Sequence, residues 1–205
     1  MASQLLGLFR TLTWNDFKQV TKPVPGPGQS ANVAQTRTNV GTNHFSLPAV
    51  RGTRPRQYQL ADMITVTIRL DAANCWKANW LTTLPQSDQD RLLKHEQGHY
   101  DLVALLGRDY FLELMQLKTN TYTKVSDFQA DLKVLDDQFL KQIQPVQDKY
   151  DGDTTHGRVQ ARQDAWNGYI KSAFTSLRIP AARDAGGIPL KQPILDILSN
   201  AGLAP

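Results

Sequence analysis

The segment Leu92-Leu93-Lys94-His95-Glu96-Gln97-Gly98-His99-Tyr100-Asp101 contains H-E-x-x-H, a pattern typical of helical zinc sites. The chain has two glutamates and four histidines in 205 residues, so random placement would give this pattern on the order of one time in a thousand. On a helix, His95 and His99 lie one turn apart on the same face and can bind one metal ion. Glu96 then flanks that ion, where it can accept a proton from a bound water.

The residues around this motif predict a long helix. Pro85 and Ser87 mark its start, and its apolar periodicity continues to Leu117. The face that this periodicity defines consists of Leu92, His99, Val103, Leu106, Tyr110 and Leu117. Because His99 belongs to this apolar face, we expect the motif to be partly buried, and a buried histidine needs a partner.

Two further helices are predicted after the first. One spans about Val125 to Lys149, where Pro145 should kink or end it, and the other spans His156 to about Leu177. Residues 150–155 are rich in Asp, Gly and Thr and are expected to form the turn between them.

The region before the helices predicts strands. From Ala31 to Leu70 there are few helix formers, and Met63–Leu70 alternates apolar and polar side chains with the period of a half-buried strand. The expected fold class is therefore α+β, with a small antiparallel sheet followed by three longer helices, the first of them a zincin-like active-site helix.

The chain divides into three predicted parts. Residues 1–30 form an N-terminal segment that ends in a Pro/Gly loop, 31–178 form a zincin-like metallopeptidase domain, and 179–205 form a C-terminal tail. We expect the one apolar stretch of the tail, Pro193 to Leu198, to pack onto the protein's own core.

Composition excludes several classes of protein. The net charge is only +4, with no aromatic-interleaved basic stripe, so a nucleic-acid partner is not expected. The single cysteine, Cys75, excludes an internal disulfide and is expected to be a small buried side chain. No apolar run reaches the ~18 residues that a membrane span needs. Residues 1–10 do not resemble a signal peptide, which predicts a cytoplasmic protein or a chain that begins after a removed leader.

A catalytic zinc usually has three protein ligands, so the motif needs a third. Glu113 lies 14 residues after His99, about 21 Å along an unbroken helix, which is too far. His156 follows the Asp/Gly/Thr turn and is the predicted third ligand, and His44 is the reserve. Leu102 and Leu105 stand where the extended metzincin pattern requires Gly and His, so that subclass is excluded.

Gly98 and the residues around His156 carry further expectations. A glycine inside a helix is tolerable where another part of the chain passes close to it, so we expect close packing at Gly98. Asp151, Asp153 and Thr155 are expected to cap a helix or to accept a hydrogen bond from a ligating imidazole.

The chain resembles a bacterial family of predicted secreted zinc-dependent proteases (domain of unknown function 922). The patches that carry the resemblance are Leu12–Phe17, Asp71–Trp76, Leu92–Asp101, and Tyr150-Asp151 with Thr154, His156, Gly157, Gln160 and Trp166. The resemblance implies a zinc peptidase with His95, His99 and His156 on the metal, and with Tyr150, Asp151 and Thr154 shaping the site. It also implies a secreted or periplasmic location. The residues after Ile179 match no pattern of the family.

These observations together predict a zinc metallopeptidase that hydrolyses peptide bonds with a zinc-activated water and Glu96 as general base. Tyr150 is the first candidate for the donor that stabilises the oxyanion, and Tyr169 is the second. The strand Met63–Leu70 is expected to pair with an extended peptide substrate.

Two alternative functions remain open. A zinc amidase that acts on cell-wall peptides would use the same residues. A non-catalytic protein with a structural metal would instead close the site with a fourth protein ligand, such as His44, Asp153 or Cys75.

Overall fold

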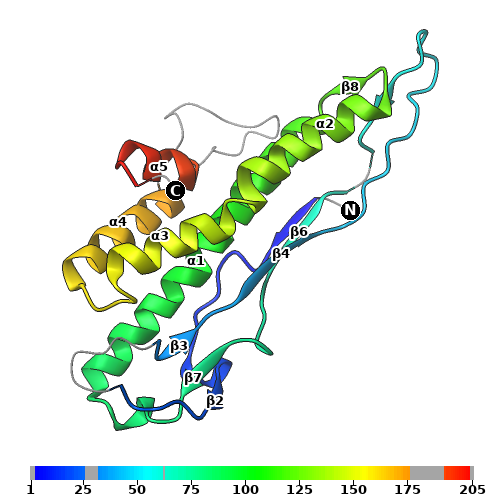
Figure 1. The fold of residues 1–205 in the computed structure, drawn as a ribbon. Coiled ribbons are helices and arrows are strands. Elements are labelled where there is room, and N and C mark those ends of the chain that lie inside the picture. Colours follow the sequence, from blue (N-terminus) through cyan, green and yellow to red (C-terminus); the bar gives the residue numbers. More distant parts are fainter. Residues whose placement is uncertain (1–2, 26–31, 62, 176–191, 204–205) are drawn as a thin grey trace.

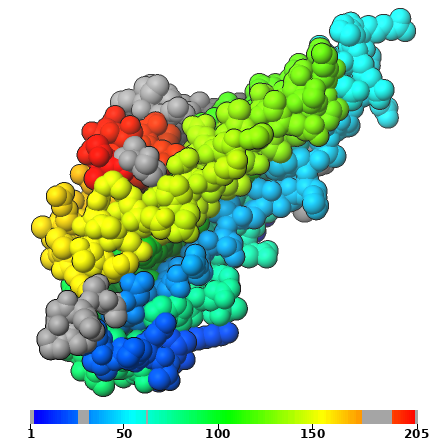
Figure 2. Space-filling model, in the orientation of Figure 1, coloured from blue at the N-terminus to red at the C-terminus, as the bar shows by residue number. Residues whose placement is uncertain are grey.

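A single long helix, α1 (Gln86–Leu117), runs the length of the molecule between the strands and the other helices (Figure 1). The structure is a computed structural model, and it describes residues 3–25, 32–61, 63–175 and 192–203. The molecule is elongated, with the strand segments along one side and the later helices along the other (Figure 2). Among the described residues, none of the helices has the length and apolar character that crossing a membrane requires.

The strands form two three-stranded sheets and one two-stranded sheet. In the first, the order is β1 (Gln4–Leu6), β6 (Thr65–Leu70), β4 (Thr38–Thr42), and in the second it is β2 (Lys18–Val20), β7 (Trp76–Ala78), β3 (Ala34–Gln35). The third sheet pairs β5 (Tyr58–Gln59) with β8 (Thr121–Tyr122). The short turns η1 (Trp14–Asp16) and η2 (Leu81–Thr83) connect these elements.

The α+β class is confirmed, but the two three-stranded sheets are mixed and not purely antiparallel. β1 runs parallel to β6, and β2 runs parallel to β7. Only β4 and β3 pair antiparallel with those central strands. The difference arises because the N-terminal segment supplies an edge strand to each three-stranded sheet, and a strand that comes from so far away in the sequence leaves no local signal.

In the described residues, the helices after α1 are shorter and more numerous than the two predicted there. They are α2 (Val125–Leu135), a π-helical turn η3 (Asp136–Leu140), α3 (Ile143–Thr154), α4 (Gln160–Thr175) and α5 (Ile194–Asn200). The predicted second helix is thus interrupted at residues 141–142, and Pro145 lies in the first turn of α3, where a missing N–H leaves no hydrogen bond unmade. The predicted end of the third helix, Leu177, lies outside the described residues.

The turn predicted at residues 150–155 is mostly helical. α3 continues through Gly152 to Thr154, and the chain leaves it at Thr155 in a left-handed conformation. His156 therefore lies in the loop between α3 and α4 and not in the first turn of the third helix. The extension of α3 and the loop after it turn the side chains of Asp151 and His156 toward α1.

The core fills the space on both sides of α1. Leu102, Leu105 and Leu106 are fully buried between β6 and the later helices. Ile194 and Leu198 of α5 are also fully buried in this cluster, which confirms that the apolar stretch of the tail packs onto the core. Cys75 is fully buried too, as predicted. The first half of α1, which carries the H-E-x-x-H motif, is thereby fixed against two sheets and two helices.

Candidate metal centre

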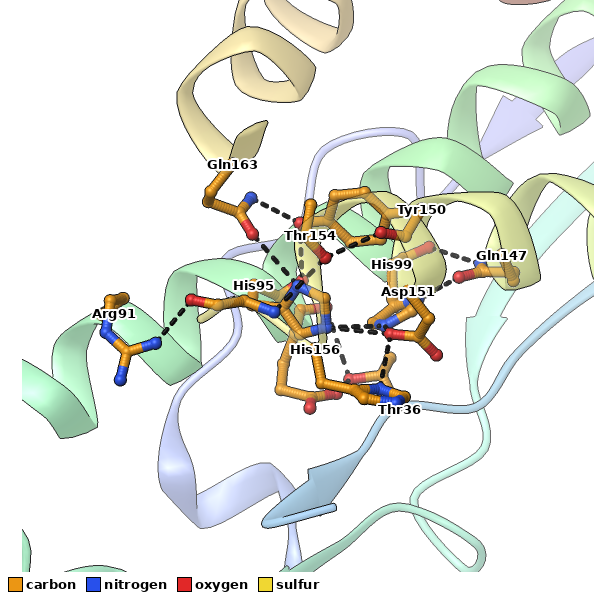
Figure 3. A network of polar contacts seen from close by, with 12 residues as sticks. Thr36, Arg91, His95, His99, Gln147, Tyr150, Asp151, Thr154, His156 and Gln163 are labelled. Carbon is orange, nitrogen blue, oxygen red and sulfur yellow. Dashed lines mark hydrogen bonds and ion pairs between the residues drawn. The ribbon is translucent and has the colours of Figure 1, made fainter. Parts of the chain in front are cut away.

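A cleft crosses α1 at the H-E-x-x-H motif. Its floor includes His95, Glu96 and His99; one wall is the strand segment 32–39, and the other is α3 with the loop that follows it. Asp151 from α3 and His156 from the loop both reach the floor (Figure 3). The cleft thus gathers three stretches of sequence, 32–39, 92–103 and 143–158, that are at least forty residues apart.

The two histidines of the motif are held by glutamines. His95 Nδ1 lies 3.0 Å from Gln163 Oε1, and the amide nitrogen of Gln163 donates to the Tyr150 hydroxyl at 2.6 Å. His99 Nδ1 contacts Gln147 Oε1, and the amide nitrogen of Gln147 donates to the His99 carbonyl at 2.8 Å. Each glutamine oxygen can only accept, so both histidines carry their proton on Nδ1. The lone pair of each Nε2 is then available to a metal.

The free nitrogens converge on one carboxylate. His95 Nε2 and His99 Nε2 are 3.1 Å apart, and each lies 3.0 Å from Asp151 Oδ1 (Figure 3). These three atoms form a triangle of possible ligands within 4.8 Å of one another. Three corners of a tetrahedral zinc site with bonds of about 2.0–2.1 Å would be about 3.3 Å apart, so a few tenths of an ångström of opening would suffice.

The chemistry of this triangle fits a cation. With the histidine protons on Nδ1, three electron-pair acceptors face one another with no hydrogen between them, an arrangement that a positive ion or a proton must relieve. Burial alone would raise the pKa of Asp151, but its close contacts with His95 and His99 and the charges of His99 and His156 lower it well below its usual range. Burial lowers the pKa of His99, yet Asp151 and Glu96 raise it overall. Positive charge is therefore favoured at this point.

Glu96 lies beside the triangle and not within it. Its carboxylate accepts a hydrogen bond of 2.6 Å from the Thr36 hydroxyl, which belongs to the strand segment across the cleft. Only 4% of the residue is exposed, and it lines the same cleft. This position suits a base that acts on a molecule in the cleft, and Thr36 fixes its orientation.

His156 reaches the site through Asp151. Its Nδ1 lies 3.1 Å from Asp151 Oδ1, and 37% of its side chain is exposed at the cleft. His156 does not belong to the group of possible metal ligands, whose third member is Asp151. Of the three ligands predicted from the sequence, the structure brings His95 and His99 together. His156 contacts Asp151 and is not a member of the ligand group.

Tyr150 lies behind the histidines, which corrects its predicted role as oxyanion donor. Its ring is fully buried and stacks on the His95 ring at 4.7 Å between centroids, and its hydroxyl donates to the His95 carbonyl at 3.2 Å. Neither Tyr150 nor Tyr169 lines the cleft. Tyr150 also explains Gly98, because a Cβ there would lie 2.8 Å from Tyr150 Cζ. The close packing expected at Gly98 is present, with a tyrosine ring as the neighbour.

The other proposed ligands lie elsewhere. His44 is exposed beside α2, at a different pocket. Cys75 contacts Arg37 in a separate apolar cluster, and Asp153 bonds to Lys149 and to the Trp166 indole. Within the described part of the chain, no fourth protein donor joins the triangle.

Several residues of the site were not identified as such from the sequence. Thr36 and Gln147 carry no signal that separates them from other surface residues. Gln163 does, because this amide recurs with Trp166, Ile170 and Phe174 at helical spacing in the sequence, and it is fully buried. Asp151 was expected near the site but was not considered as a ligand.

No protein-family model matches the sequence, and no curated protein or solved structure matches it either. The resemblance to the zinc-dependent protease family therefore stays a prediction that rests on the residues quoted for it.

Proposed function

We propose that this protein is a zinc-dependent peptidase whose metal is held by His95, His99 and Asp151. The observation that carries the proposal is the triangle of acceptor atoms at 3.0–3.1 Å, set at the bottom of a cleft with Glu96 beside it. The absence of a fourth donor among the described residues leaves room for a water, as a catalytic site requires and a structural site does not.

The protein's own residues would divide the chemistry as follows. A zinc ion bound there supplies a Lewis acid and lowers the pKa of a nearby water. Glu96, oriented by Thr36, accepts the proton of the attacking water and passes it to the leaving amine.

The open edge of β4 supports an extended peptide as substrate. β6 was predicted to pair with the substrate, but it is the central strand of its sheet and both its edges are occupied. β4 is an edge strand, and it borders both the cleft and a neighbouring groove that shares Thr38, Asn39, Ile143 and Gln144 with it. A peptide that left the metal centre along this groove would run beside β4.

The register of β4 shows which of its backbone groups are available. Asp71 N donates to Arg37 O, and Asn43 N donates to Thr65 O, so the odd-numbered residues of this segment form the hydrogen-bonded pairs with β6. The N–H and C=O groups of Thr38, Val40 and Thr42 then point away from β6, toward the open edge. They are the groups that an added strand would use.

A zinc amidase on cell-wall peptides would use the same centre, but a short branched amide would leave most of this edge unused. A secreted or periplasmic location rests on the family resemblance alone and forms part of the proposal.

The test begins with metal content. Purified protein should contain about one zinc per chain by elemental analysis, cleave casein or an unstructured peptide, and lose this activity with a chelator. His95→Ala should abolish both zinc binding and cleavage. Zinc retained without cleavage of any peptide, together with a large fall in melting temperature on chelation, would favour the structural role. Cleavage of cell-wall peptides alone would favour the amidase.

A further inference from the structure

The loop between α3 and α4 has an unusual backbone. Thr155, His156 and Gly157 have φ angles of 51°, 52° and 74°, three consecutive residues in the left-handed region. Only the last of them is a glycine. Side chains with a Cβ disfavour this conformation, so the surrounding contacts must hold Thr155 and His156 in it.

This conformation places the loop against both sides of the metal centre. It turns His156 Nδ1 to within 3.1 Å of Asp151 Oδ1. It also brings the backbone of Gly157 onto His95, so closely that a Cβ on Gly157 would lie 2.8 Å from the Cβ of His95. The loop therefore contacts two of the three residues that would hold the metal.

Arg91 ties this loop to α1. It lies one helical turn before His95, and its Nη1 donates to the Gly157 carbonyl at 2.5 Å (Figure 3). Its Nη2 donates to Asp88 at 3.2 Å, which fixes the other end of the guanidinium. Within the loop and α3, Gly157 N donates to the Thr154 hydroxyl at 3.3 Å. Arg91 thus adds a side-chain hydrogen bond between the strained loop and the motif helix, beside the packing of Gly157 on His95.

We propose that Arg91 is a positioning residue of the metal centre. It holds the loop in its left-handed form, the loop keeps His156 against Asp151, and His156 keeps the carboxylate aimed at His95 and His99. The proposal rests on the proposed function in that it requires a metal at this triangle. It adds that metal affinity depends on a side chain that does not contact the metal, as residues that orient ligands do elsewhere.

The test measures zinc affinity by competition with a chromophoric chelator, using the full chain. Arg91→Ala should weaken zinc binding by about 10–100-fold, the usual scale for losing a group that orients a ligand. Arg91→Lys keeps one donor for the Gly157 carbonyl and should lose less. Lys94→Ala, an exposed position on the same helix, is the matched control and should bind zinc like the unaltered protein.

A double variant tests the route through His156. If Arg91 acts through the loop, zinc affinity in Arg91→Ala with His156→Ala should equal that of His156→Ala alone. Losses that multiply would show that Arg91 acts independently and would overturn the proposal. Unfolding measurements on the zinc-free proteins identify a merely structural role. In that case Arg91→Ala lowers stability but leaves zinc affinity unchanged, and this result would also overturn the proposal. If Arg91→Ala does not fold, Arg91→Lys gives the same comparison.

The two proposals fail in distinguishable ways. An unaltered protein that binds no zinc would refute the metal centre itself. An unaltered protein that binds zinc no better than Arg91→Ala would refute only the role of Arg91.

Discussion

The two halves of α1 bury polar groups in opposite ways. In the second half, Arg108 donates through Nε and Nη2 to Asp109 Oδ1 at 2.8 and 2.6 Å, and Asp109 Oδ2 accepts from Ile194 N at 2.8 Å. Arg108 and Asp109 thus neutralise each other. In the first half, His95 and His99 satisfy only their Nδ1 atoms with glutamines and direct their other nitrogens at a carboxylate.

This difference separates a structural polar pair from a binding site. Arg108 and Asp109 neutralise each other's charge. They also hold α4 and the start of α5 in place, because Arg108 donates to the carbonyls of Ala173 and Gln192. The triangle of His95, His99 and Asp151 has no such internal partner, and the proposed cation would complete it. A buried polar cluster therefore indicates a ligand site when its members present electron-pair acceptors to one another. It indicates a structural role when opposite charges neutralise each other.

The largest effect should come from Glu96→Gln. The amide can still accept from the Thr36 hydroxyl, so the fold and zinc binding should persist, but the proton acceptor is lost. Peptide hydrolysis should fall by about 100–10,000-fold, measured as kcat/KM on a fluorogenic peptide. Turnover equal to that of the unaltered protein would break the comparison, because the first half of α1 would then have no catalytic role.

The second half of α1 should respond in stability alone. Arg108→Met leaves Asp109 buried without a partner of opposite charge and should lower the free energy of unfolding by about 3–5 kcal/mol, measured by denaturant titration. Zinc affinity of the folded protein should not change. In Arg108→Met with Asp109→Leu no lone charge remains, so the loss should be smaller. An equal or larger loss in the double variant would contradict this reading.

The loss in Arg108→Met should also depend on pH. Burial raises the pKa of Asp109 to about 6 even with Arg108 beside it, and without the guanidinium the pKa should rise further. A carboxyl whose pKa is raised on folding destabilises the fold as pH rises from about 4 through that pKa. The variant should therefore lose less at pH 5 than at pH 7.

Two helical glycines give a smaller, matched contrast. Gly98→Ala would push into the Tyr150 ring, which is fully buried against His95, and should lower the free energy of unfolding by about 1–3 kcal/mol and weaken zinc binding. Gly152→Ala, in α3 with open space around it, should raise that free energy by about 0.5–1 kcal/mol. Effects of the same sign in both would show that helix propensity, and not contact with Tyr150, decides.

The smallest effect concerns the open edge of β4. When an uncleaved peptide binds to Glu96→Gln, amide hydrogen exchange should slow at Thr38, Val40 and Thr42. Asn39 and Gly41 already bond to β6 and serve as internal controls. Slowing confined to the odd-numbered residues, or absent throughout, would rule out pairing along this edge.

The features that were predictable from the sequence are those with a local signal. The apolar periodicity from Leu92 to Leu117 and the H-E-x-x-H motif predict α1 and two side chains of the candidate metal centre. The apolar stretch Pro193–Leu198 predicts the docking of α5. The parallel pairing of β1 and β2 was not predictable, because three-residue strands carry almost no periodicity and their partners lie about sixty residues away.

The predictions about the details of the site were wrong for a different reason. The Asp/Gly/Thr composition of residues 150–155 is that of a turn, but packing against α1 extends α3 through Gly152 to Thr154. That extension points Asp151 at the histidines, and the same packing buries Tyr150. Which face of a helix a tyrosine takes depends on tertiary contacts, so its hydroxyl could not be assigned from the sequence.

The docking of α5 fixes the order in which the chain can mature. Ile194 N bonds to Asp109, 85 residues earlier, and Ile194 and Leu198 fill the main apolar cluster. A ribosome delivers these residues after α1 and the Thr36 segment, so a nascent chain contains the H-E-x-x-H helix before α5 can complete the core against the second half of that helix. Until then Asp109 lacks its backbone donor from α5, and the growing chain exposes apolar surface that chaperones bind.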